Sequence, residues 1–153
     1  MSDIKVNLTD NLIQLLDDLV INTGVNSANL ITEDGLVIAI NSEQDDQDEE
    51  LNSNFAAISA SILSIAERGI EIINANKILE QIKIDAGLNS NVEADFTILI
   101  SRVFSNVLLQ VTFPKRINIG LIHFETNKII KQIKSIIQKD TSREIFTEVG
   151  SLL

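Results

Sequence analysis

The chain has 153 residues, 44% of them hydrophobic and 22% charged, which is the composition of one soluble globular domain. No cysteine is present, so disulfides, thiolate zinc sites and a cysteine nucleophile are excluded. The net charge of −10 comes from residues 1–76, which hold fourteen acids and two bases, whereas residues 77–153 hold eight acids and ten bases. This acidity argues against a nucleic-acid partner, and it either favours a partner with a basic surface or simply maintains solubility.

Neither a targeting segment nor a membrane span is expected. The most apolar stretch, residues 96–113, is interrupted by Arg102, Asn106 and Gln110, so it does not fit a membrane-spanning helix. No basic flank followed by an apolar run occurs near the first residue, so no signal peptide is expected. Together with the lack of cysteine, these features favour a cytoplasmic location.

The first predicted elements are a helix and a hairpin. Leucines recur at helical spacing over residues 8–22, so this segment predicts an amphipathic helix, which Gly24 would end. Two apolar runs, 27–32 and 36–41, flank Asp34-Gly35, a strong signal for a tight hairpin turn. No Walker-type phosphate loop is present, so the chain is not expected to hydrolyse nucleotides itself.

The acidic run 43–50, EQDDQDEE, is predicted to be a solvated loop ahead of a helix N-terminus, where negative charge is favourable. Its carboxylates do not have the spacing of an EF-hand, and the central glycine of that motif is missing. We therefore expect no metal site in this run.

The second helix, predicted over residues 51–69, has two faces that both lack the charge of an ordinary surface helix. One face is a stripe of large apolar residues, which we expect to pack on the sheet: Leu51, Phe55, Ile58, Ile62 and Ile65. The other face is rich in small residues and predicts contact with another subunit, unless the helix is fully buried within one domain. The candidate interface residues on this face are Asn52, Ala56, Ser59, Ala60, Leu63 and Glu67.

The remainder of the chain predicts three strands and a long helix. Alternation over residues 78–85 indicates a half-buried strand, and runs 96–102 and 107–113 form a second hairpin. A helix over residues 118–139 follows, with Asn118 as its N-cap, and the tail 141–153 is expected to form at most one further short helix. The order α-β-β-α-β-β-β-α predicts an α+β fold with an antiparallel sheet.

This order of elements resembles the roadblock/dynein-light-chain family over residues 8–139. Local sequence agrees with the family as well. The matching pieces are Leu15-Leu16 before Leu19, Gly24-Val25, Asp34-Gly35-Leu36, Phe55-Ala56-Ala57, Pro114-Lys115 and Asn118-Ile119-Gly120-Leu121. The acidic run 43–50 and the tail fall outside the common pattern, so nothing carries over to them.

The resemblance implies a single roadblock-like domain, residues 1–140, followed by the tail 141–153. It implies a five-stranded antiparallel sheet with two helices on one face and one on the other. It also implies dimers, in which the second helices pack together and the 78–85 strands meet edge to edge. The residues that this edge would contribute are Ile78, Glu80, Ile82 and Ile84.

By the same resemblance, family members bind small Ras-like GTPases as activators, platforms or scaffold subunits. The prediction is a non-enzymatic dimeric regulator or platform that binds such a GTPase, and whether it also modulates GTP hydrolysis stays open. The alternative is a structural scaffold subunit that pairs with another roadblock-type chain, so homodimer and heterodimer both stay open. A third interpretation, a small-ligand sensor, would require a pocket lined by convergent polar groups, of which the sequence gives no sign.

No catalytic residue and no cofactor are predicted. His123 is the only histidine and is interpreted as structural, and the four lysines of the last helix are interpreted as a solvated face. If the protein lends a guanidinium to a GTPase, the candidates are Arg68, Arg102 and Arg116. A purely structural role is the default interpretation for each of the three, and Arg68 would suit the dipole at the end of its helix.

Overall fold

The computed structural model describes residues 2–45, 49–87 and 95–152. The elements in chain order are α1 (Ser2–Thr23), β1 (Ser27–Thr32), β2 (Val37–Ile40), α2 (Ser42–Asp45), α3 (Glu49–Ile73), β3 (Gln81–Ala86), β4 (Phe96–Phe104), β5 (Val107–Pro114) and α4 (Ile119–Leu152). Apart from the single-turn α2, this is the predicted order.

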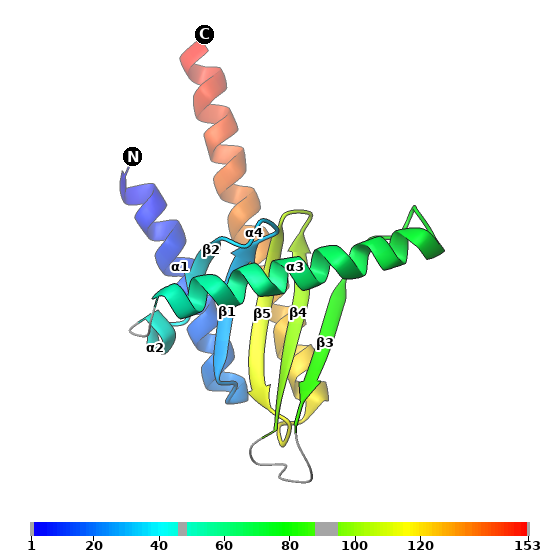
Figure 1. Ribbon diagram of the computed structural model, residues 1–153. Coiled ribbons are helices and arrows are strands. Elements are labelled where there is room, and N and C mark those ends of the chain that lie inside the picture. Colours follow the sequence, from blue (N-terminus) through cyan, green and yellow to red (C-terminus); the bar gives the residue numbers. More distant parts are fainter. Residues whose placement is uncertain (1, 46–48, 88–94, 153) are drawn as a thin grey trace.

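The five strands form one open antiparallel sheet with the order β2-β1-β5-β4-β3. Helices α1 and α4 pack against each other and cover one face, while α3 crosses the other face (Figure 1). The predicted fold, with two helices on one face of the sheet and one on the other, is confirmed.

Two apolar cores of unequal size hold the layers together. The larger core lies between the sheet and the helix pair, where α1 contributes Leu16 and Leu19 and α4 contributes Ile122 and Ile133. The smaller core lies under α3 and consists of Ile31, Ala56, Leu63, Ile100 and Leu108. Because α3 rests on the smaller core, the polar contacts described below carry more weight in fixing its position.

Several predicted boundaries were wrong. Residues 42–45 form a helical turn held by Asp17, whose carboxylate accepts hydrogen bonds from the Ser42 amide at 2.8 Å and hydroxyl at 2.6 Å. Glu49 and Glu50 belong to the first turn of α3, and residues 46–48 of the acidic run lie outside the described residues. The tail is not a separate element, because α4 runs on to Leu152; residues 141–152 contain no proline that would end it.

Other ends also differ from the predictions, since α1 begins at Ser2 rather than at residue 8 and α3 ends at Ile73 rather than at residue 69. The edge strand begins at Gln81, three residues later than predicted. At the start of α4, the Asn118 side-chain oxygen accepts a hydrogen bond from the Gly120 amide at 2.7 Å, as expected for an N-cap. Within the described ranges, no helix is both long and apolar enough to cross a membrane.

The predicted Asp34-Gly35 turn is confirmed, and it packs directly on α3. Gly35 has φ of 91°, a conformation that costs little only for glycine, and its amide donates to the Thr32 carbonyl at 3.0 Å. A Cβ atom added at Gly35 would lie 2.9 Å from the Ala57 Cα of α3. The turn therefore requires glycine both for its backbone angle and for its contact with the helix.

We expect Gly35→Ala to lower the free energy of unfolding by about 1–3 kcal/mol, because it strains the turn and pushes it off α3. Gly69→Ala is the matched control, since a Cβ there meets no atom within 4 Å and alanine favours the helix. Urea unfolding followed by circular dichroism measures both variants. Equal stabilities of Gly35→Ala and the parent would show that this contact is not a constraint.

Candidate interaction surfaces

Helix α3 packs on the sheet through its small residues, so the predicted orientation of this helix was wrong. The residues of α3 that are buried within the single chain are Asn52, Ala56, Ser59, Ala60 and Leu63. These are the residues assigned above to an outward interface, together with Glu67, which is partly buried at the end of the same face. Small side chains let the helix approach the sheet closely, which large isoleucines in their place would prevent.

The large apolar side chains of α3 consequently point outward. Leu51, Ile58, Ile65, Ile72 and Ile73 are between 57% and 86% exposed, while Phe55 and Ile62 on the same face are half-buried. These seven residues are called the α3 stripe below. They recur at helical spacing along 23 residues, or about 34 Å of helix, and Gly69 takes the position between Ile65 and Ile72.

Polar contacts fix the rotation of α3 about its axis. The Gln110 side chain of β5 accepts a hydrogen bond from Asn29 Nδ2 of β1 at 3.2 Å, and its own amide donates to the Ser59 hydroxyl of α3. All three side chains are buried. The signal for this contact in the sequence is that Asn29 and Gln110 are polar residues within otherwise apolar strands. Their contact with α3 was not predicted from it.

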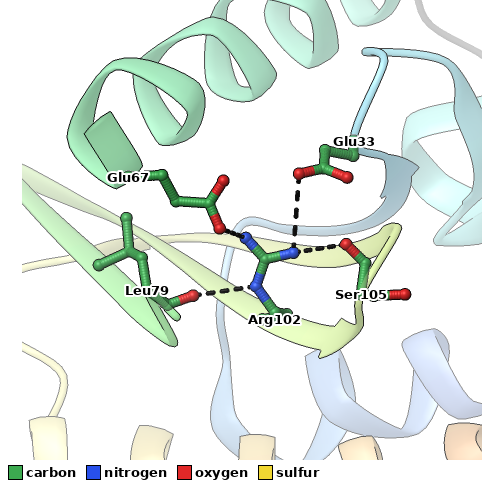
Figure 2. Close-up of polar contacts among 5 residues, drawn as sticks. All are labelled: Glu33, Glu67, Leu79, Arg102 and Ser105. Atoms are coloured by element: carbon green, nitrogen blue, oxygen red, sulfur yellow. Dashed lines mark hydrogen bonds and ion pairs between the residues drawn. The ribbon is translucent and has the colours of Figure 1, made fainter. Parts of the chain in front are cut away.

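Arg102 of β4 ties the second half of α3 to the sheet (Figure 2). Its Nε donates to the Leu79 carbonyl at 2.9 Å, its Nη1 donates to the Ser105 carbonyl at 2.6 Å, and its Nη2 pairs with the Glu67 carboxylate. A longer ion pair of 3.9 Å joins Nη1 to Glu33 in the β1–β2 turn. With a side chain only 10% exposed, this guanidinium connects four separate segments.

The three candidate arginines therefore differ in their availability to a partner. Arg102 is engaged on all sides and is not free to enter another protein. Arg68 lies exposed on α3 and has no ion-pair partner among the described residues. Arg116 is also exposed and belongs to the turn between β5 and α4. The connection between these two elements lies at the end of the sheet away from α3 (Figure 1). The structure does not bring the three together.

Strand β3 forms one edge of the sheet and pairs on one side with β4. Ile82 and Ile84 are half-buried and pack toward the small core under α3, whereas Ile78 and Glu80 are exposed and precede the strand. The other side of β3 has no neighbouring strand within the described chain. The predicted pairing of this edge with a second chain thus stays a prediction.

The far end of β3 is anchored by a charged cross-strand contact. The Thr97 hydroxyl donates to Asp85 Oδ1 at 2.6 Å and thereby lowers the pKa of the Asp85 carboxyl. The Lys83 ammonium, 3.4 Å from the same carboxylate, acts in the same direction. No group of three histidine, cysteine, aspartate or glutamate side chains with metal-binding geometry occurs in the described residues.

We expect Arg102→Ala to lower the free energy of unfolding by about 2–3 kcal/mol, because it leaves the partly buried Glu67 carboxylate and two carbonyl groups without their donor. Arg68→Ala removes the same side chain from an exposed position of α3 and should change stability by about 0.5 kcal/mol or less. Chemical unfolding of both variants measures the difference. Similar stabilities would mean that Arg102 does not hold α3 in place.

No family model matches the chain, and no curated protein matches it by sequence. Solved structures do match it. A roadblock/LC7 domain from Streptomyces avermitilis is 18% identical with a TM-score of 0.67, and the match covers 82% of this chain and 96% of that one. The gliding protein MglB of Thermus thermophilus is 13% identical with a TM-score of 0.71, covering 86% of this chain and 92% of that one.

MglB of Myxococcus xanthus is similar to the same extent, with 16% identity and a TM-score of 0.70 over 84% of this chain and 96% of that one. At such identities the likeness concerns the fold, and it extends over most of each chain. The family resemblance seen in the sequence is confirmed at this level: the chain has the roadblock/LC7 fold.

Proposed function

We propose that this chain is a non-enzymatic, dimeric regulator or platform that binds a small Ras-like GTPase. The GTPase is what the roadblock resemblance implies, and the observation that carries the proposal is the exposed α3 stripe. Burying one isoleucine or leucine side chain contributes roughly 1.5–3 kcal/mol, so a partner that covers several of them gains substantial free energy. Rows of exposed apolar side chains on one helix face mark interaction sites.

A second copy of the chain is the first occupant that we propose for part of this stripe. A two-fold axis places identical surfaces against each other, so two α3 helices can bury their isoleucines mutually. The same symmetry would bring together two β3 edges and thus satisfy the backbone groups that are unpaired in the single chain. Pairing with a different roadblock-type chain uses the same surfaces and gives the scaffold alternative.

The GTPase would contact the outer side of the paired α3 helices. The excess of acids in residues 1–76, which include the whole of α3, favours a partner with a basic surface. Arg68 is the exposed arginine on this helix, so it is the one of the three candidates that we propose to face the GTPase. An arginine placed at the transferring phosphate would accelerate hydrolysis, whereas one placed elsewhere would support binding alone.

We expect Ile65→Arg to disrupt the dimer and raise its dissociation constant by about tenfold or more, because the substitution places a charge in an apolar contact. Ser64→Arg is the matched control, since it adds the same charge to α3 at an exposed position next to the stripe. Size-exclusion chromatography with light scattering gives the mass of each variant. Ala60→Arg is unsuitable, because Ala60 is 5% exposed and the change would unfold the domain.

A parent protein that is monomeric at micromolar concentration, or one whose dimer survives Ile65→Arg, would contradict this use of the stripe. A mixture with other roadblock-type chains that yields only heterodimers would favour the scaffold alternative.

The GTPase part of the proposal has its own test. Small Ras-like GTPases from the same source are assayed for binding in both nucleotide states and for GTP hydrolysis, with and without the protein. We expect binding, and we expect Arg68→Ala to weaken binding or to remove any acceleration, whereas Arg116→Ala leaves both unchanged. If none of these GTPases binds while the dimer is intact, the GTPase part of the proposal is rejected and the dimer part is retained.

A further inference from the structure

A groove of about 860 Å³ lies on the face of the sheet opposite α3, between α4 and the edge formed by β3 and β4. Its wall is one face of α4, which contributes His123, Asn127, Lys131 and Lys134. Helix α4 runs obliquely across the face of the sheet opposite α3 (Figure 1) and packs against β4. The groove therefore has a polar lining, which was not predicted from the sequence.

The floor of the groove is firmly held. Ser101 of β4 is 4% exposed, and its hydroxyl accepts a hydrogen bond of 3.0 Å from Gln81 Nε2 on β3. Val103, also on β4, is buried in the large core beneath α4. Because these residues belong to paired strands, the floor does not need to be ordered when a ligand enters, and that lowers the entropic cost of binding.

The groove is lined by more cationic than anionic side chains. Lys131 and Lys134 are exposed and have no ion-pair partner among the described residues, and Glu80 is the one carboxylate in the lining. Two other lysines of α4, Lys128 and Lys139, lie outside the groove. The four lysines that were interpreted as one solvated face thus fall into two different environments.

We propose that this groove binds an acidic peptide segment of a partner protein in an extended conformation. The residues of α4 that line it run from His123 to Gln138, which corresponds to about 22 Å along the helix and matches about six or seven extended residues. A compact anion would occupy only part of that length. Free ammonium groups are complementary to carboxylates, and here they are concentrated in a concave site on a protein with a net charge of −10.

The groove opens on the face of the sheet away from the α3 stripe, so an acidic segment bound there would leave the stripe uncovered. The groove does adjoin the proposed dimer edge, because Ile78 and Glu80 also line it. This inference does not depend on the proposed GTPase, and each can fail without the other.

The test measures binding of a fluorescein-labelled hexaglutamate peptide to the full chain by fluorescence anisotropy at low salt. We expect the double variant Lys131→Gln and Lys134→Gln to weaken binding about fivefold. The matched double variant Lys128→Gln and Lys139→Gln removes the same charge from α4 outside the groove and should change binding less than about twofold. All four lysines are exposed, so neither variant is expected to impair folding.

Amide chemical shifts of the ¹⁵N-labelled protein locate the bound peptide. Perturbations at residues 101–105 and on the groove side of α4 support the proposal, whereas perturbations on α3 overturn it. If the two double variants weaken binding equally, overall charge explains the binding and the proposed groove is overturned. If hexaglutamate does not bind at all, the site is rejected. Equally strong binding of free glutamate would show a site for small anions, and this result would also overturn a peptide groove.

Discussion

The close approach of α3 to the sheet is the constraint on which the interaction surfaces depend. Ala56, Ser59 and Ala60 are small enough to let the helix backbone lie near the strands, and Leu63 fills the space that remains. An isoleucine in place of any of the three would have to push the helix away from a close-packed sheet. The large side chains of α3 are therefore directed outward by the packing itself, and the apolar stripe follows from the geometry of the layer beneath it.

Two polar anchors make this orientation specific, because the small apolar core under α3 gives little directional preference. Gln110 reaches Ser59 near the middle of the helix, and Arg102 reaches Glu67 about two turns later. Hydrogen bonds are directional, so two of them along one helix fix both its rotation and its position along the sheet. Arg102 also lines the groove on the far side of the sheet edge, so the end of β4 is a structural part of both proposed surfaces.

The sequence predicted well what depends on local pattern. The Asp34-Gly35 turn, the element order and the N-cap at Asn118 were all read from short-range signals, and the family resemblance supplied the layers. The face of α3 that meets the sheet was predicted wrongly, because periodicity shows that a helix has two apolar faces but not which one is inward. That choice is made by residues distant in sequence, such as Gln110, which lies 51 positions from Ser59. The groove was missed for the same reason, since its wall and floor come from separate elements.

Exposed isoleucines on a strongly acidic chain place opposing demands on self-association. Copies of a protein with a charge of −10 repel one another, so unspecific contacts between apolar surfaces are disfavoured. A contact that aligns the stripe along its length would bury more apolar surface than a partial overlap, whereas the charge repulsion would be similar in both. The acidity thus disfavours poorly matched contacts between stripes of two copies. It favours either a well-matched copy or a basic partner, for which the charge becomes an attraction, and these are the two occupants that we propose for the stripe.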